Sequence, residues 1–470
     1  MLRVKIPRVC QNELHYSLQV LLGEFLGLQY EVEEFDGELI EISECLSQFC
    51  VDAQHSAPRL TLDASFFHKA NQFWLKAESM PVLPLEVWVP SVSGIDANLV
   101  DVSVPVLYGK QGVVRSGLNC HINLDIFGSA FFMLSRYEEL VSTERDTHNR
   151  FPAWASVAYK SNFLDRPIVN EYLEILWQCV KMMWPDLVRK PYVKKNVITC
   201  DCDHPFDNSI YSLKLAIRKT ARLLLVDKKP IAASKAACRY FAAKLNFRVN
   251  DVYRDSINWM MDVNEAHGNS VTFYFISHKT SDLDGLVDFN SSKMRRLLRE
   301  ISARGHKIGV HPGYETYTNS DNFSLSVHTL KMVLKEEGIE QKEFGGRQHY
   351  LRWDTAQTAT LVEQSGLGFD SSLSFADKCG FRCGVCYEFT MYDLFKRKAY
   401  NFKQRPLIVM ECTIIDSHYE ALGYTKKAIQ RFEYFKRVCH QFNGSFNLLW
   451  HNCHLGQKDR DIYQRLIKLD

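Results

Sequence analysis

Between residues 197 and 450, short apolar segments that suit strands alternate with longer segments whose apolar residues recur at helical spacing. The strand-like segments are rich in β-branched and aromatic residues, as in V-T-F-Y-F-I at 271–276, and a helix-like segment commonly ends at a glycine such as Gly305. This alternation is typical of a parallel sheet whose strands are joined by helices. The predicted strands are 197–199, 271–276, 307–310, 344–347, 406–410 and 447–450, and the predicted helices are 292–303, 327–337 and 355–364.

The chain before about residue 190 has a less regular pattern. Alternating apolar and acidic residues predict a half-buried strand at 30–35, and helical spacing predicts helices at 18–28, at 126–140 and from 166 to about 183. A Pro- and Lys-rich connector at 184–195 indicates a boundary. We therefore predict a mixed α/β accessory domain over residues 1–190 and a (β/α) barrel over residues 191–470.

The stretch from 209 to 266 is predicted to be largely helical and broken near Pro230. Its first part, K-L-A-I-R-K-T-A-R-L-L-L-V-D-K-K, is basic and amphipathic. Such a helix can lie on an anionic surface or against a polyprenyl-phosphate substrate. A solvated helix whose apolar face packs on the core is the commoner structure, and it is the one we expect here.

Composition narrows the class of protein. Among the 470 residues, 46% are hydrophobic and 24% are charged, as in ordinary globular proteins, and the net charge of +2 argues against binding of nucleic acid through phosphate contacts. There is no apolar run of roughly 20 residues that would span a membrane, and the N-terminus lacks the apolar core of a secretory signal. The 14 cysteines are scattered, as expected of reduced thiols. We therefore expect a soluble cytoplasmic protein.

Polar residues follow one predicted strand after another. In V-I-T-C-D-C-D-H-P, Asp201 and Asp203 are two residues apart and so face the same side of a strand, with His204 directly after them. The residues at strand ends are Asp201, Asp203, His311, Arg347, Asp370 and His451. Because the active sites of parallel barrels lie at the carboxyl ends of the strands, these positions predict a metal or acid–base site.

The order of these motifs resembles the polysaccharide deacetylases of the NodB-homology superfamily, carbohydrate esterase family four, over about residues 197–451. The resemblance rests on T-C-D-C-D-H at 199–204, G-H-K-I-G at 305–309, G-G-R-Q-H-Y at 345–350 and N-L-L-W-H-N at 447–452. The first part of the chain is similar to the extra domain that precedes such barrels in proteins tied to bacterial surface-polysaccharide genes. The resemblance implies a deformed (β/α) barrel of the NodB-homology type.

The resemblance also implies a role for each motif. Asp201 would be the general base, with Arg347 orienting it, and His451 would protonate the leaving group. Asp203 and His311 would bind a divalent metal ion, most readily zinc, with cobalt or nickel as alternatives. The family has a second histidine four residues after the first, but here that position is Glu315, and Pro312 replaces a small hydroxyl residue.

The sequence does not decide whether the third metal ligand is Glu315, His204 or a water molecule. A metal-free variant of the site is a further alternative. His349, Asp370 and Arg382 are expected to contact substrate. Arg136, Glu138, Glu139, Asp146 and His148 are expected to form an ion-pair network that fixes a loop instead of a site.

These expectations describe a metal-dependent hydrolase that removes acetyl groups, expected to be N-acetyl groups, from a sugar or glycan precursor in bacterial surface-polysaccharide biosynthesis. Two other functions stay open, and so does the oligomeric state. The missing second histidine allows a non-catalytic carbohydrate-binding or scaffold protein on a decayed barrel. The C-x3-C-x2-C spacing of Cys379, Cys383 and Cys386 allows an iron–sulfur radical enzyme, but this motif lies late in the chain and buried reduced thiols are preferred.

Overall fold

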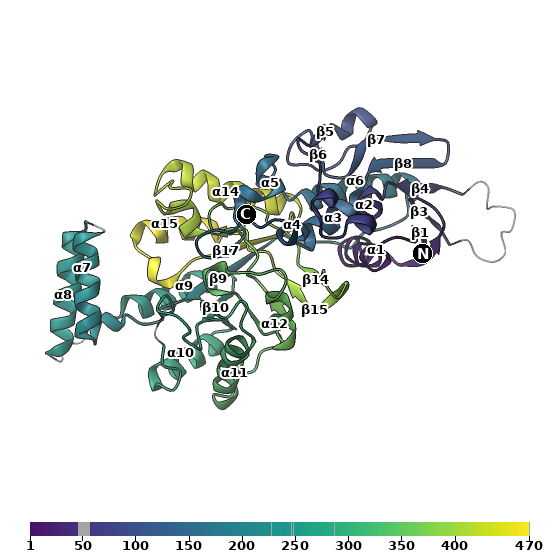
Figure 1. Ribbon diagram of the computed structural model, residues 1–470. Coiled ribbons are helices and arrows are strands. Elements are labelled where there is room, and N and C mark those ends of the chain that lie inside the picture. The colour runs from purple at the N-terminus through teal and green to yellow at the C-terminus, as the bar shows by residue number, and fades with distance from the viewer. Residues whose placement is uncertain (46–56, 227, 246, 248, 286, 470) are drawn as a thin grey trace.

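The computed structural model describes residues 1–45, 57–226, 228–245, 247, 249–285 and 287–469 (Figure 1). Within these residues, six of the strands before residue 125 form one mixed sheet in the order β2-β1-β3-β4-β8-β7. Its strands are β1 (Leu2–Pro7), β2 (Tyr30–Phe35), β3 (Ile40–Glu44), β4 (Arg59–Leu62), β7 (Gly109–Ser116) and β8 (Asn119–Leu124). A separate antiparallel pair is formed by β5 (Glu86–Trp88) and β6 (Val104–Val106).

The second sheet has nine strands among the described residues, in the order β14-β15-β13-β12-β11-β10-β9-β17-β16. All neighbouring pairs are parallel except β14 and β15. The strands are β9 (Lys195–Cys202), β10 (Val271–Phe275), β11 (Lys307–Val310), β12 (Gly345–Gly346), β13 (Phe369–Asp370), β14 (Phe389–Asp393), β15 (Lys398–Gln404), β16 (Val409–Met410) and β17 (Ser445–Leu449). The predicted α/β class and parallel sheet are thus confirmed.

Closure of this sheet into a barrel is not shown by its strand pairing. In the described part of the chain, β16 pairs with β17 but not with β14. Residues 405–408 instead run between β13 and β17, where the amide of Arg405 donates to the carbonyl of Asp370 and the amide of Ile408 donates to the carbonyl of Asn447. The sheet is therefore strongly curved, and a short irregular segment bridges two strands that do not pair directly.

Helices pack on both sheets. Those before β9 are α1 (Gln11–Leu18), which continues as the π-helix η1 (Gln19–Phe25), α2 (Ser65–Phe73), α3 (Ile126–Leu134), α4 (Tyr137–Val141), α5 (Val157–Lys160) and α6 (Ile168–Met183). Those after α8 are α9 (Val252–Glu265), α10 (Ser292–Ala303), α11 (Ser320–Glu336), α12 (Thr358–Gln364), α13 (Glu411–Ile415), α14 (Lys426–Gln441) and α15 (Gln457–Leu466). No helix of the described residues is long and apolar enough to cross a membrane.

Where a local pattern decides the structure, prediction and structure agree closely. Both α10 and β11 have the predicted bounds, and the apolar residues of α10 at helical spacing, such as Leu297 and Ile301, are buried. Helix α11 begins at Ser320 and not at 327, because the side chain of Asn319 accepts a hydrogen bond from the amide of Asn322 and caps it. The helix predicted at 126–140 is divided at Arg136, whose φ is 57°.

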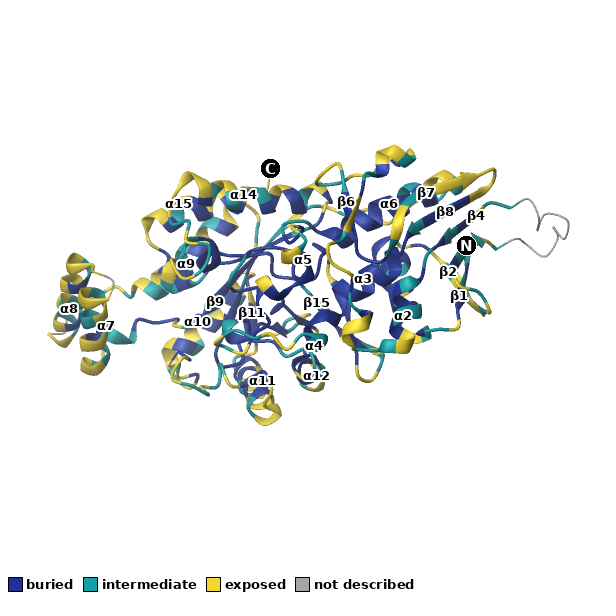
Figure 2. Ribbon diagram, turned by 45° about the horizontal axis from the view of Figure 1, so that its top comes forward, coloured by how far each residue is buried: buried dark blue, intermediate teal, exposed yellow. Residues whose placement is uncertain are grey.

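The basic stretch forms a helical hairpin of α7 (Leu213–Leu225) and α8 (Pro230–Lys244), which stands away from both sheets in Figure 1. The break near Pro230 is confirmed. The expected packing of its apolar face on the core is wrong, since Ala216 is the buried residue of α7, and Ala233 and Tyr240 are those of α8. Figure 2 shows the hairpin mostly exposed, in contrast to the buried sheet strands.

One hydrophobic core runs through both sheets. The hairpin of β14 and β15 packs on the first part of the chain, where the hydroxyl of Tyr16 donates to the carbonyl of Thr390 at 2.7 Å. Buried Glu13 accepts hydrogen bonds from Arg397 and from the Tyr392 hydroxyl. The predicted boundary near residue 190 separates the strands of the two sheets, while the side chains of both parts share an interior.

A buried ion-pair network crosses this interior and corrects the role expected for Arg382. Arg382 is 2% exposed, and its guanidinium donates two hydrogen bonds of 2.8 Å to Glu139. Glu139 also pairs with Arg136, which in turn pairs with Glu138 at 2.7 Å. Arg382 therefore does not line the pocket described below, and its charge is neutralised within the protein and not by a substrate anion.

We expect Glu139→Gln to lower the free energy of unfolding by about 3–5 kcal/mol at neutral pH, because it leaves Arg382 without its buried carboxylate. Burial raises the pKa of Glu139, but Arg382 and Arg136 outweigh this and lower it from 4.5 to about 2. The ionised carboxylate therefore contributes fully to the free energy of unfolding above pH 4.5. This contribution is lost as the pH falls toward the pKa of Glu139 in the folded protein. The difference between wild type and variant should shrink over that window.

Denaturant unfolding at several pH values measures this difference. Exposed Glu144 provides the matched control, since Glu144→Gln should change stability by no more than about 0.5 kcal/mol. A difference for Glu139→Gln that stayed constant from neutral pH to the acid end would contradict the assignment.

A candidate metal-binding active site

The site lies where the parallel strands of the second sheet end. Because parallel strands direct their carboxyl ends to one edge, β9, β11, β12, β16 and β17 bring polar residues together there. Close packing of strands sets this edge: a Cβ on Gly309 of β11 would lie 2.5 Å from the ring of Tyr274 on β10. The close packing of β10 and β11 thus requires glycine at the end of G-H-K-I-G, two residues before His311.

Asp203, His311 and His349 form a group that could hold a metal ion. Nε2 of His311 lies 3.3 Å from Oδ1 of Asp203, and Nε2 of His349 lies 3.7 Å from the same oxygen. A tetrahedral zinc site places its nitrogen and oxygen ligands roughly 3.3 Å apart, as follows from metal–ligand distances near 2 Å. The three ligand atoms therefore have the spacing that such an ion requires.

Each imidazole of this group is held so that Nε2 is available to a metal. Nδ1 of His311 lies 2.5 Å from the carbonyl of Arg347, which can only accept, so this nitrogen carries the proton. Nδ1 of His349 donates to Asp284 at 2.6 Å. Asp284 is itself fixed by the backbone amides of Thr280 and Tyr314. Such partners orient metal-binding histidines and fix their tautomer.

Asp203 has the features expected of a metal ligand. Its Oδ1 is buried and accepts no hydrogen bond from the described residues. Burial raises the pKa of Asp203, but the nearby imidazoles of His349, His311 and His451 outweigh this and lower it, so the carboxylate is ionised. An ionised carboxylate with an unpaired buried oxygen between two oriented imidazoles fits a divalent cation such as zinc.

Asp201 lies beside this group and is held by Arg347. The guanidinium Nη1 donates to Oδ1 of Asp201 at 2.9 Å, while Oδ2 of Asp201 lies 3.7 Å from Nε2 of His311. Arg347 is fully buried and also donates to Thr199 and Ser371. One oxygen of Asp201 is therefore fixed by a charge-assisted hydrogen bond, and the other faces the metal group.

His451 completes the site from the other side, and its partner is Glu411, a residue that the sequence analysis did not single out. Nδ1 of His451 lies 2.6 Å from Oε1 of Glu411, and Nε2 lies 3.9 Å from Oδ2 of Asp203. Burial lowers the pKa of His451, but Glu411 and Cys412 raise it well above its usual value. Glu411 follows the predicted strand 406–410 directly, so the strand-end rule applied there would have found it.

The other predicted site residues lie in different surroundings. Glu315 has a side chain that is 53% exposed, pairs with Arg352 and lies outside the metal group, so its spacing after His311 does not make it a ligand. His204 lines the pocket without joining that group. Asp370 is the last residue of β13, where it is buried and accepts hydrogen bonds from the amide and hydroxyl of Ser372. It is not among the residues that line the pocket.

The cysteine motif does not form a cluster site in the described residues. Cys379, Cys383 and Cys386 are all buried, and they do not form one of the groups whose ligand atoms converge. The Sγ of Cys379 faces the carbonyl of Met410, and that of Cys386 faces Asn170. The preference for buried reduced thiols agrees with this arrangement.

The site opens into a pocket of about 970 Å³. Its floor includes Asp201, Asp203, His311, His349 and His451, and one wall is formed by residues of α7 such as Arg218 and Lys219. Tyr350, which follows His349, also lines the pocket and has a left-handed backbone with φ of 61°. The arrangement can bind a cation, accept a proton at Asp201 and donate one from His451 within a single cavity.

Comparison with models of known protein families gives a match in the first part of the chain. Residues 2–185 match a family described as a family of unknown function, DUF7033. No curated protein sequence matches. Among solved structures, the chain is similar to a protein from Mycobacterium smegmatis that carries the provisional name polysaccharide deacetylase, with a TM-score of 0.38 and 14% identity over 60% of this chain and 84% of that one. It is also similar to PuuE allantoinase, with a TM-score of 0.30 and 13% identity over 45% of this chain and 65% of that one.

The metal ion of the Asp203–His311–His349 group is the one whose binding Asp203→Asn should abolish. We expect Asp284→Asn to weaken the affinity for this ion by about 10–100-fold, because Nδ1 of His349 would lose its carboxylate partner. His349→Ala should weaken this affinity further, since it deletes the ligand itself. Competition with a chromogenic zinc chelator measures these affinities. Glu315→Gln is the matched control and should leave the affinity unchanged; a loss equal to that of His349→Ala would restore Glu315 as the third ligand.

Proposed function

We propose that the protein is a metal-dependent hydrolase that removes acetyl groups from a sugar or glycan precursor. The observation that carries this proposal is the convergence of three devices on one pocket: the Asp203–His311–His349 group, the Asp201–Arg347 pair and the His451–Glu411 pair. Hydrolysis of an amide needs a water-activating base, stabilisation of the oxyanion and a proton for the leaving amine. Each need has a matching group here.

A divalent ion such as zinc, held by Asp203, His311 and His349, would polarise the acetyl carbonyl and lower the pKa of water. In the proposed reaction Oδ2 of Asp201 takes the proton of the attacking water. Arg347 donates a hydrogen bond of 2.9 Å to Oδ1 of Asp201 and so fixes the direction of the free oxygen, Oδ2. Cobalt or nickel are alternatives to zinc at ligands of this type.

His451 gives its Nε2 proton to the leaving nitrogen or oxygen. Glu411 supports this role because its carboxylate accepts from Nδ1 at 2.6 Å and favours the protonated imidazole. Oδ2 of Asp201 lies 3.7 Å from Nε2 of His311, and Nε2 of His451 lies 3.9 Å from Oδ2 of Asp203, so the base and the acid both lie beside the metal group. The base–metal–acid arrangement is the one implied by the resemblance to polysaccharide deacetylases.

The substrate we propose is an N-acetylated sugar or glycan precursor, nucleotide- or lipid-linked, used in bacterial surface-polysaccharide biosynthesis in the cytoplasm. A pocket of about 970 Å³ has room for a sugar with part of its carrier. The cations of α7 along one wall, including Lys214 and Arg218, suit a carrier phosphate. His349, first expected to contact substrate, is assigned to the metal instead.

A carbohydrate-binding protein without activity is the second candidate, and one feature argues against it. Binding a sugar needs neither a carboxylate buried against arginine nor a histidine paired with glutamate. Asp201 is 2% exposed and Glu411 is 2% exposed, and such buried charged groups are retained at a cost in stability. Their joint position at the metal group favours catalysis.

We expect Asp201→Asn and His451→Ala each to lower turnover by about 10²–10⁴-fold with the fold retained, because each removes one proton-transfer group. Acetate release from a panel of N-acetylated amino sugars, their nucleotide diphosphate derivatives and a polyprenyl-linked derivative is the assay. Glu315→Gln serves as the control and should keep wild-type turnover. Near-wild-type turnover in Asp201→Asn or His451→Ala would refute the assigned roles, and binding of a sugar without acetate release would favour the second candidate.

A further inference from the structure

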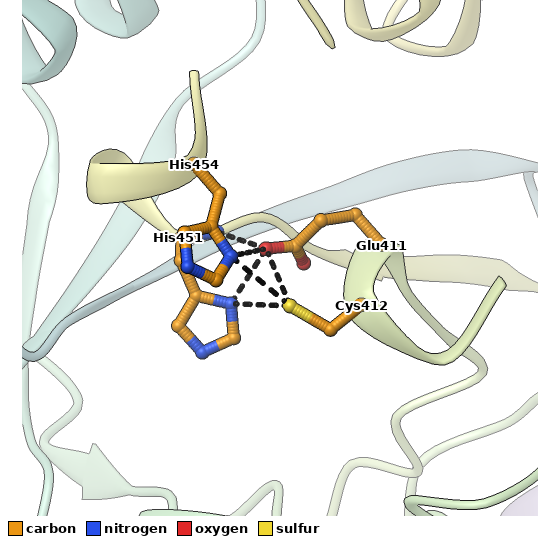
Figure 3. A group of neighbouring side chains, drawn as sticks. All are labelled: Glu411, Cys412, His451 and His454. Carbon is orange, nitrogen blue, oxygen red and sulfur yellow. Dashed lines mark hydrogen bonds and ion pairs between the residues drawn. The ribbon is translucent and has the colours of Figure 1, made fainter. Parts of the chain in front are cut away.

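Next to the proposed active site lies a second cluster of metal-ligating side chains that the proposed function leaves unexplained. Glu411, Cys412, His451 and His454 place four ligand atoms within 4.8 Å of one another (Figure 3). Glu411 alone is sufficient to orient the imidazole of His451 and to favour its protonated form. The thiol of Cys412 and the second imidazole, that of His454, are additional.

The distances among these atoms resemble those of a tetrahedral zinc site. Sγ of Cys412 lies 3.2 Å from Nδ1 of His454 and 3.9 Å from Nδ1 of His451, and Oε1 of Glu411 lies 3.4 Å from that Sγ. With zinc–sulfur distances near 2.3 Å and zinc–nitrogen or –oxygen distances near 2.0 Å, ligand atoms would be roughly 3.3–3.6 Å apart. The three distances to Sγ need to change by only a few tenths of an ångström, while Nδ1 of His451 and Oε1 of Glu411, 2.6 Å apart, have to separate by roughly 0.7 Å to bind one ion.

The fold brings these residues together for a simple reason. Glu411 and Cys412 begin α13 directly after β16. After β17, His451 precedes the short helix η8 (Asn452–His454), and His454 is the last residue of that helix. The two strands are parallel neighbours, so both segments emerge at the same edge. Oε2 of Glu411 is buried and accepts no hydrogen bond from the described residues, so the carboxylate has an oxygen without a partner.

We propose that Glu411, Cys412, His451 and His454 form a second metal site for a divalent ion of the zinc class. Cys412 binds as the thiolate, and its proton passes to solvent as the ion enters. The donor set of one sulfur, two imidazole nitrogens and one carboxylate oxygen suits zinc or cobalt and not magnesium or calcium. Cys412 and His454 line the pocket, so the ion has a path from solvent.

The second site shares His451 with the proposed active site. Nδ1 of His451 faces the Cys412 cluster, and Nε2 faces Asp203 at 3.9 Å. An ion bound at Nδ1 displaces the proton that Glu411 otherwise shares with this nitrogen. Occupation of the second site thereby changes the state of the imidazole that we assign to proton donation. The existence of the site does not depend on that assignment.

Cobalt loading tests the second site without an activity assay. A thiolate bound to Co²⁺ gives a charge-transfer band in the near ultraviolet, which the Asp203 group cannot give because it holds no sulfur. We expect two cobalt ions per chain and this band in the wild type, one ion with the band in Asp203→Asn, and one ion without the band in Cys412→Ser. Cys453→Ser, which changes a neighbouring thiol of the same pocket, should keep both ions and the band.

His454→Gln provides a second variant, because its side chain is 51% exposed and its replacement leaves the core unchanged. It should retain the fold by circular dichroism and bind the second cobalt at least tenfold more weakly. Absence of the band in cobalt-loaded wild type, or its persistence in Cys412→Ser, would overturn the proposal. Loss of turnover in the assays above would affect the proposed function and leave this result untouched.

A different observation, the exposed hairpin of α7 and α8, carries a second inference. The sequence from 213 to 245 has nine Lys and Arg residues and one acid, Asp227. Large apolar side chains are exposed among these cations, and they include Ile217 (60%), Leu225 (77%), Ile231 (72%) and Phe241 (62%). Cations alone would suit nucleic acid, but exposed Leu, Ile and Phe among them suit the boundary between lipid headgroups and acyl chains.

We infer that this hairpin binds the surface of an anionic lipid bilayer. The pocket of the proposed active site extends along α7, where Leu215, Arg218 and Leu223 line it, so a bound membrane would lie next to the pocket mouth. Such a position suits a lipid-linked substrate, a link that rests on the proposed function. Attachment to the membrane itself rests on the charge and exposed apolar surface of the hairpin.

Cosedimentation with vesicles tests this inference. We expect binding to phosphatidylcholine vesicles that contain phosphatidylglycerol, weaker binding at high salt, and little binding to phosphatidylcholine alone. Lys228→Gln with Lys235→Gln should weaken binding about fivefold per cation, from about 1 kcal/mol each. Lys426→Gln with Lys427→Gln, exposed on α14, is the matched control. Equal binding by all variants, or binding to an oligonucleotide and not to vesicles, would refute it.

Discussion

The hydrogen bonds of one buried arginine determine the arrangement of the proposed site. Arg347 is fully buried, and a guanidinium stays charged inside a protein, so it must be satisfied there. It donates to Asp201 and Thr199 of β9 and to the backbone and hydroxyl of Ser371, which follows β13, while its own residue follows β12. Its guanidinium also lies 4.8 Å from the ring centroid of Tyr274 on β10. One side chain thus joins four strands at the edge where the site forms.

The same principle orients the histidines. In His311, His349 and His451, Nδ1 is held by a carbonyl, an aspartate and a glutamate respectively, and Nε2 in each is directed toward Asp203. A group whose ring is fixed before a ligand arrives loses little conformational freedom on binding. The acidic partners Asp284 and Glu411 are as necessary to this arrangement as the ligands, because they decide which nitrogen is free.

The first part of the chain contributes to the second mainly through a shared interior, and its Arg150 also lines the pocket. The pair of Glu139 and Arg382, and that of Glu13 and Arg397, join residues more than 200 positions apart. Both pairs are hydrogen-bonded, and Glu13, Glu139 and Arg382 are buried, so the two parts have one interior with shared polar contacts as well as shared apolar packing. The first part thereby supports the β14–β15 hairpin and the loop around Arg382, which lie beyond the reach of the pocket.

The sequence by itself determined the elements whose signals are local. Apolar spacing and a glycine stop determined α10, and the short segment K-I-G-V, in which Ile308 and Val310 alternate with other residues, determined β11, because helix and strand periodicities are properties of neighbouring residues. The strand-end rule also brought Asp201, Asp203, His311, Arg347 and His451 to one edge, since parallel strands share a direction. The tertiary structure decided the partners: His349 in place of Glu315 beside Asp203, Glu411 beside His451, and Glu139 beside Arg382. It also decided that the α7–α8 hairpin does not pack on the core. These depend on which loops and helices meet in space, and that is set by contacts between residues far apart in the chain, on which local pattern carries no information.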